Sequence, residues 1–118
     1  MGFHLLHKAT TAFPGHLAEH VRTVAHPVLV EFANKDTPTC RMEEPVLAKI
    51  LRRYADRLAV LQADVETSGA DAAELGVTAV PTFILFVDGT ERMRLVGYQT
   101  LAQLTRALDE ALPPAEAA

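Results

Sequence analysis

The residue with the most evident chemistry is the single cysteine of the chain, Cys40, which ends the segment Asp36-Thr37-Pro38-Thr39-Cys40. A thiolate is the form that attacks a disulfide, and a second thiol nearby must then release the mixed disulfide. Thr37 stands three residues before Cys40, where a dithiol enzyme carries that second thiol. A threonine hydroxyl does not replace a thiolate, because its pKa lies far above working pH. We therefore expect no dithiol–disulfide exchange within one chain.

The reactivity of Cys40 depends on the element that positions it. The helical spacing of the apolar residues that follow predicts a helix with Thr37 at its N-cap, Pro38 at the favoured first position and Cys40 at the third. A helix N-terminus, the neighbouring charge of Arg41 and a hydrogen bond donated by the Thr37 hydroxyl all favour a thiolate. Burial and nearby acids oppose it, so the sign of the pKa shift stays open. These acids are Glu31, Asp36, Glu43 and Glu44.

The length, charge and cysteine content limit the classes of protein to which this chain can belong. The chain has 118 residues, of which 49% are hydrophobic, and this size matches one compact domain. Its formal net charge of −4 offers no basic surface to nucleic acid or to an anionic membrane. A single cysteine excludes an intrachain disulfide, and residues 1–8 lack the pattern of a signal peptide. We expect a soluble, cytoplasmic protein, and the excess of arginine over lysine hints at a GC-rich bacterial genome.

Hydrophobic periodicity predicts an alternation of strands and helices with a parallel first part and a terminal antiparallel hairpin. The hairpin signal is Asp88-Gly89, and Pro45 predicts a kink in the longest helix. The predicted helices cover about Pro14–Val24, Pro38–Asp56, Ser68–Gly76 and Leu101–Leu112, and the predicted strands cover Pro27–Ala33, Leu58–Val65, Pro81–Val87 and Glu91–Val96, after a short apolar start.

Several of these motifs fall at the mutual spacings of one known family. They are Val28-Leu29-Val30-Glu31-Phe32 leading to Cys40-Arg41-Met42 and Pro45, then Val80-Pro81-Thr82, Gly89 and Gly97. From about Val21 to Leu112 the chain resembles the thioredoxin family. The resemblance implies the thioredoxin fold, an α/β three-layer α/β/α sandwich around a central mixed sheet of four to five strands. The domain would cover residues 1–112, and residues 113–118 would form a flexible tail.

The resemblance also assigns expected roles to residues. Cys40 corresponds to the buried resolving cysteine of the family, and Glu31 to the buried carboxylate that exchanges a proton with it. The family's lysine partner is Gln62 here, which predicts a raised pKa for Glu31.

The resemblance further implies a cis peptide bond at Val80-Pro81 and a groove that pairs with an extended peptide. One wall of this groove would be Ala79, Val80, Pro81 and Gly97, and the other Thr37, Pro38 and Thr39. Ala33 and Asp36 replace two tryptophans of the family's substrate surface.

The first functional hypothesis is binding of a partner protein or peptide at this groove, without dithiol–disulfide reductase activity. The alternative is a monothiol redox enzyme, in which Cys40 forms a sulfenic acid or a mixed disulfide and is resolved by another molecule. Thr37-x-x-Cys40 also resembles the Thr-x-x-Cys core of peroxiredoxins. We expect no cofactor, and a monomer or a weak dimer, for which a Cys40-linked dimer is the least favoured form. His16-Leu17-Ala18-Glu19-His20 matches a zinc-peptidase pattern, but no third ligand is evident and no metal site is expected.

Overall fold

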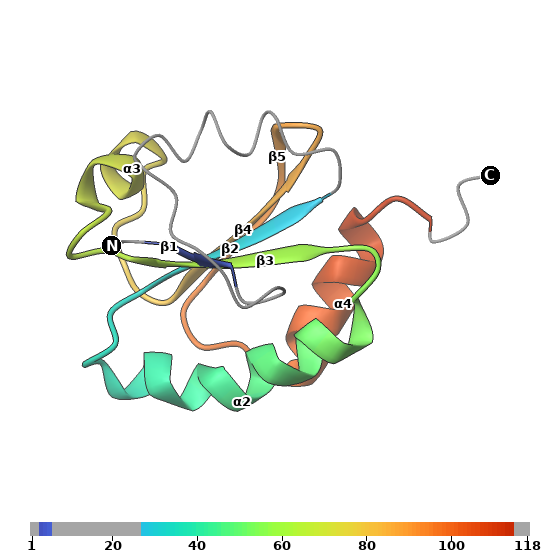
Figure 1. Ribbon diagram of the computed structural model, residues 1–118, viewed down its shortest axis with the longest axis horizontal. Helices are drawn as coiled ribbons and strands as arrows, with labels where there is room; N and C mark the ends of the chain where they lie inside the picture. The colour runs from blue at the N-terminus through green and yellow to red at the C-terminus, as the bar shows by residue number, and fades with distance from the viewer. Residues whose placement is uncertain (1–2, 6–26, 115–118) are drawn as a thin grey trace.

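A computed structural model describes residues 3–5 and 27–114 of the chain. Five strands and three helices lie in these residues (Figure 1). The predicted helix at 14–24, the His16–His20 pattern and the end of the predicted tail lie outside the described residues. The elements are β1 (Phe3–Leu5), β2 (Val28–Ala33), α2 (Pro38–Arg53), β3 (Ala59–Asp64), α3 (Gly69–Glu74), β4 (Thr82–Val87), β5 (Thr90–Val96) and α4 (Leu101–Ala111).

The strands form one five-stranded sheet in the order β1-β3-β2-β4-β5. In Figure 1, α2 and α4 lie on one face of this sheet and α3 lies on the other. The predicted three-layer α/β/α sandwich with a mixed sheet is therefore confirmed. The expected parallel first part was wrong for β1, which pairs antiparallel with β3, whereas β2 and β3 are parallel. The alternation of apolar residues in Phe3–Leu5 is the same in both directions, so it does not define strand direction.

The core consists of two apolar layers, one on each face of the sheet. Successive side chains of a strand point to opposite faces. Val28, Val30 and Phe32 therefore pack in the layer beneath α3, whereas Leu29 packs with residues of α2 and α4. Glu31 has the same parity as Leu29 and shows no exposed surface, so the fold places its carboxyl on the α2 face.

Helix α2 carries the predicted site residues at its N-terminal end. Its buried residues, Cys40, Glu43, Leu47 and Ile50, recur with the helical period. Pro45 lies inside the helix, which continues on both sides of it. The helix ends at Arg53, earlier than expected.

A tight turn joins the end of β4 to the start of β5. Asp88 and Gly89 have positive φ angles of 54° and 78°, so the predicted two-residue hairpin is confirmed.

Helix α4 follows β5 and begins with a capping box, in which Thr100 and Gln103 each satisfy the backbone N–H of the other. Within the described residues, no helix has both the length and the apolar character needed to cross a membrane.

Candidate functional site

The loop between β2 and α2 positions Thr37 and Cys40. The Asn34 side-chain oxygen accepts the Asp36 N–H at 2.9 Å, and the Asn34 carbonyl accepts the Thr37 N–H at 2.9 Å. The Thr37 carbonyl then accepts the N–H of Cys40 at 3.0 Å and that of Arg41 at 3.1 Å, which closes the first turn of α2. Thr37 takes the N-cap position as predicted, but its hydroxyl makes no capping hydrogen bond.

The Cys40 sulfur is closed off from solvent, with 3% of the residue exposed. Its hydrogen-bond donor is the Asn34 backbone N–H, 3.5 Å from Sγ, and not the Thr37 hydroxyl that we expected. Burial raises the pKa of the Cys40 thiol above its ordinary value of 9.0, the Asn34 N–H lowers it, and the charges of Glu31 and Glu43 raise it further. Burial raises the pKa more than the Asn34 N–H lowers it, so the site favours the neutral thiol.

Glu31 is fully buried in the middle of β2. The Gln62 side chain donates from Nε2 to Glu31 Oε1 at 2.9 Å, and Glu31 Oε2 has no partner within the described part of the chain. Burial raises the pKa of Glu31 to about 7, the Gln62 hydrogen bond lowers it, and the charges of Glu43 and Glu44 raise it. The predicted raised pKa is therefore confirmed, and this carboxyl titrates near neutral pH.

Glu43 is a second fully buried carboxyl, one turn after Cys40. Its Oε1 accepts the Gln99 backbone N–H at 2.8 Å, whereas Oε2 has no partner among the described residues. Burial raises the pKa of Glu43, and the hydrogen bond from Gln99 lowers it. From the sequence, Glu43 is expected only as an acid near Cys40. Its place in the helical period of the buried residues would have shown that it faces the core.

The second group of predicted residues lies where β4 begins and β5 ends. The Val80-Pro81 peptide bond is cis, and the Gly97 N–H donates to the Pro81 carbonyl at 2.7 Å. The Thr82 hydroxyl donates to the Ala79 carbonyl at 2.6 Å. Gly97 has a φ of 92°, which disfavours a side chain at this position. Pro81 and Gly97 are thus held together at the end of the sheet.

Glu43 connects the two groups of site residues. One group is Glu31, Thr37, Pro38, Thr39 and Cys40, and the other is Val80, Pro81 and Gly97. The Gln99 backbone donates to Glu43, while the Gln99 side chain donates from Nε2 to the Gly97 carbonyl at 3.1 Å. The first turns of α2 are therefore tied to the loop that follows β5. Within the described residues, no cluster of three or more histidine, cysteine or acidic side chains is arranged to hold a metal ion.

The substitution Glu31→Gln tests the burial of this carboxyl. Because the pKa of Glu31 is raised from 4.5 to about 7, the folded state binds more protons than the unfolded state between these values. Protonated Glu31 stabilises the folded state fully below about pH 4.5, and this stabilisation is lost as the pH rises through 7. We expect the free energy of unfolding of Glu31→Gln to rise relative to the wild type by about 3 kcal/mol across this window.

Urea unfolding of both proteins at pH 4 to 8 measures this difference, and the control is Glu74→Gln, which removes an exposed acid from α3. If the free energies of unfolding of the wild type and of Glu31→Gln changed in parallel with pH, this would contradict the raised pKa of Glu31.

Alkylation of the thiol tests the closure of Cys40. We expect the folded wild type to react with iodoacetamide at least about a hundredfold more slowly at pH 7 than the protein in urea, because only an exposed thiolate reacts. The rate should rise with an apparent pKa above 9.0. The matched control is the double variant Cys40→Ser with Thr39→Cys, which moves the thiol to an exposed neighbouring position. Equal rates for the wild type and this control would show that the sulfur is open.

Comparisons with known proteins agree with this geometry. The thioredoxin family model matches residues 8–110. A thioredoxin of Mycobacterium tuberculosis is 39% identical over 87 residues, covering 74% of this chain and 75% of that protein. A thioredoxin of Alicyclobacillus acidocaldarius is 35% identical over 86 residues, covering 73% and 82%. The structure of a mutant thioredoxin from Halobacterium salinarum superimposes with a TM-score of 0.73 and 29% identity, covering 82% of this chain and 84% of that one. The chain belongs to the thioredoxin family of redox proteins, and its fold is the thioredoxin fold.

Proposed function

We propose that this protein has lost the dithiol–disulfide exchange of its family and acts by binding an extended segment of a partner protein or peptide. The observation that carries the proposal is the state of the single sulfur atom. Cys40 is 3% exposed, its pKa is raised, and the sequence contains no second thiol to resolve a mixed disulfide. We further propose that it works in the bacterial cytoplasm, which a single cysteine and the bacterial thioredoxin relatives support.

The proposed groove offers backbone groups that an extended peptide could bind. The Val80 backbone N–H and carbonyl have no hydrogen-bond partner within the described residues, and the neighbouring Ala79 is exposed. An extended peptide binds such free backbone groups in the manner of an added strand. On the opposite wall, Pro38 and Thr39 lie at the start of α2, and both are exposed. The exposure of Ala79, Pro38 and Thr39 supports peptide access to both proposed walls, although Cys40 itself is buried.

An exposed apolar side chain next to the groove supports the same proposal. Val96 has 60% of its surface exposed at the end of β5, directly before Gly97. Apolar groups at the edge of a groove add contact area to the backbone hydrogen bonds of a bound peptide. A peptide paired with Val80 could therefore also cover Val96.

The alternative, a monothiol redox enzyme, also has an observation in its favour. Glu31 influences Cys40 electrostatically and has a pKa of about 7, which suits a proton acceptor for the thiol. The alternative requires the sulfur to be reached by peroxide or a small thiol, and burial of Cys40 opposes this. Consumption of peroxide by the wild type that is absent in Cys40→Ser would favour the enzyme over the binding protein.

Thr37→Cys tests the loss of dithiol exchange. We expect the wild type to be inactive in the reduction of insulin disulfides with dithiothreitol as the electron donor. Thr37→Cys should reduce insulin at least about tenfold faster than the background rate of the wild type. It adds a thiol at the N-cap of α2, three residues from Cys40. The matched control, Thr39→Cys, adds an exposed thiol at the wrong spacing and should stay inactive. Reduction by the wild type at the rate of a dithiol thioredoxin would overturn the proposal.

A pair of lysine substitutions on β5 tests the binding groove. Peptides selected from a random library against the wild type should perturb the amide NMR signals of Val80 and Gly97. We expect Val96→Lys to weaken their affinity about tenfold, because it places a charge at the apolar edge of the groove. Thr90→Lys adds the same charge at the exposed far end of the same strand and should change affinity less than about twofold. Equal effects of both variants would place binding elsewhere.

A further inference from the structure

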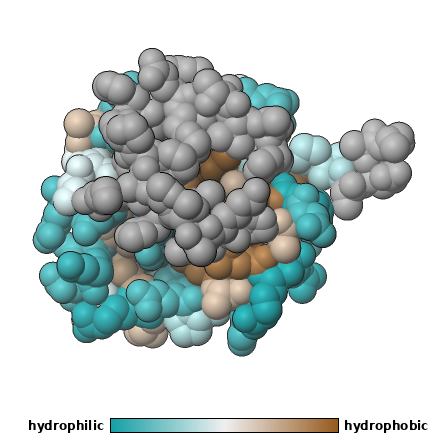
Figure 2. Space-filling view, viewed as in Figure 1, coloured by the Kyte–Doolittle hydropathy of each residue, from teal (hydrophilic) through white to brown (hydrophobic). Residues whose placement is uncertain are grey.

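A carboxyl group lies at a position of α2 where packing alone favours an apolar side chain. Glu43 shows no exposed surface and shares the buried stripe of the helix with Cys40, Leu47 and Ile50. In Figure 2 the lower rim of the molecule, where α2 lies, is largely hydrophilic, and Glu43 is not part of this surface. Burial of a carboxyl group costs free energy unless hydrogen bonds replace those that it made with water.

Hydrogen bonds replace only part of the lost hydration of Glu43. Its Oε1 accepts the Gln99 backbone N–H at 2.8 Å, whereas its Oε2 has no partner among the described residues. A buried acceptor without a donor reduces stability. The stability of α2 therefore does not explain this carboxyl group. The hydrogen bond from Gln99 is the interaction that an apolar residue at position 43 would lack.

Through Gln99 this contact continues to the Pro81 wall of the proposed groove. The Gln99 side chain donates from Nε2 to the Gly97 carbonyl at 3.1 Å and to the Val96 carbonyl at 3.4 Å. The Gly97 N–H in turn donates to the Pro81 carbonyl at 2.7 Å. A series of hydrogen bonds therefore joins the side chain of Glu43 to the backbone of Pro81.

Glu43 also lies close to the other wall of the proposed groove. Thr39 precedes it in α2 by about one helical turn. The segment 97–99 connects β5 to α4 and belongs to no helix or strand. Its place relative to α2 therefore depends on contacts outside the regular elements, and the Glu43–Gln99 hydrogen bond is one of them.

We propose that Glu43 is a positioning residue for the peptide groove. It holds the segment 97–99 against α2 and so fixes the distance between the two groove walls, without touching the peptide itself. This role rests on the function proposed above and deepens it, because it names a buried residue that controls the affinity of the same groove. A groove that is already held in its binding conformation loses less conformational freedom when the peptide binds.

Glu43→Leu separates positioning from a purely structural role. The variant should unfold at the same or a higher urea concentration than the wild type, because it removes a buried oxygen that has no partner. A peptide selected from a random library against the wild type should nevertheless bind to it at least about fivefold more weakly. Unchanged affinity in Glu43→Leu, at any stability, would overturn the proposal.

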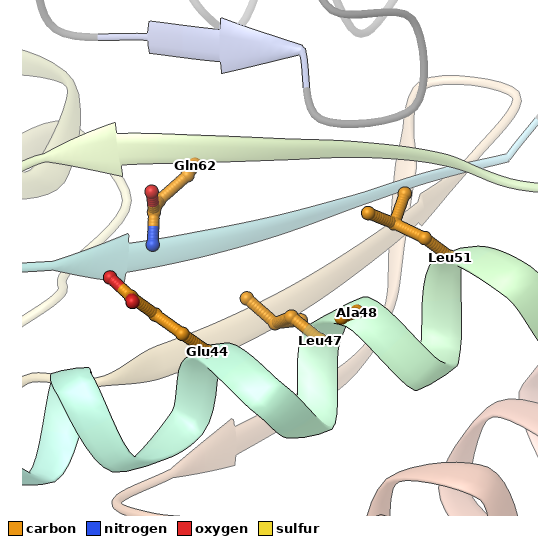
Figure 3. Close-up of a pocket in the computed structure, with 5 residues that line it drawn as sticks. All are labelled: Glu44, Leu47, Ala48, Leu51 and Gln62. Atoms are coloured by element: carbon orange, nitrogen blue, oxygen red, sulfur yellow. The ribbon is translucent and has the colours of Figure 1, made fainter.

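Two further variants of α2 serve as controls for the affinity measurement. Glu43→Gln keeps an oxygen that accepts the Gln99 N–H and should retain the affinity within about twofold. Glu44→Leu makes the leucine substitution at the next residue, which is exposed and lines a small pocket with Gln62 of β3 (Figure 3). It should also change the affinity less than about twofold. Equal weakening by Glu44→Leu and Glu43→Leu would contradict a specific role of position 43.

Amide hydrogen exchange measures the same link without a peptide. In Glu43→Leu the Gln99 amide should exchange at least about tenfold faster than in the wild type, because it loses its acceptor. The Ile50 amide, inside α2, should keep its wild-type rate. An unchanged exchange rate of the Gln99 amide would show that Glu43 does not hold the segment 97–99.

The peptide measurements also distinguish this role from the function on which it rests. Peptides that bind the wild type and Glu43→Leu equally well would overturn the role of Glu43 and leave the proposed groove intact. If no selected peptide shifts the amide signals of Val80 and Gly97 in the wild type, the proposed function itself is overturned, and the role of Glu43 in binding with it.

Discussion

Burial of ionisable groups between β2 and α2 is the constraint on which this site depends. β2 is covered on both faces, so the residue at position 31 must face α2 whatever its polarity. Glu31, Cys40 and Glu43 share this layer, and burial is the leading cause of the raised pKa of each. The charges of Glu31 and Glu43 also oppose ionisation of Cys40. The layer is therefore most stable when it is neutral, which is the opposite of what a thiolate nucleophile requires.

Much of the fold was predictable because its signals are local. The buried run Val28–Ala33, the Asp88-Gly89 turn and the helical period of α2 each reflect a backbone or packing requirement within a few residues. The direction of β1 was not predictable, because three alternating residues fit a sheet edge in either orientation. The end of α2 at Arg53 also differed from the expected position, because the apolar pattern continues through Tyr54, the residue that caps the helix.

The candidate site was predictable only in part. Glu31 and its Gln62 partner followed from a carboxyl in a buried strand and from the family resemblance. The donor to Cys40 was missed, because an interaction with the Asn34 backbone depends on how the loop folds and not on side-chain type. The link from Glu43 to Gln99 was missed for a related reason, since its partner is a backbone N–H that is 56 residues away along the chain. Such contacts leave no pattern of residue types in a sequence.

Strand β5 has a further consequence, which concerns self-association. It forms one edge of the described sheet, and an unpaired edge can recruit a strand from another molecule. Glu91, Arg92 and Arg94 lie along this edge, and the β4–β5 register is irregular between Leu85 and Phe86. Charged side chains and a local irregularity both discourage continuous pairing between copies. The protein thereby keeps an open sheet edge beside the proposed groove while resisting polymerisation into extended β-structure.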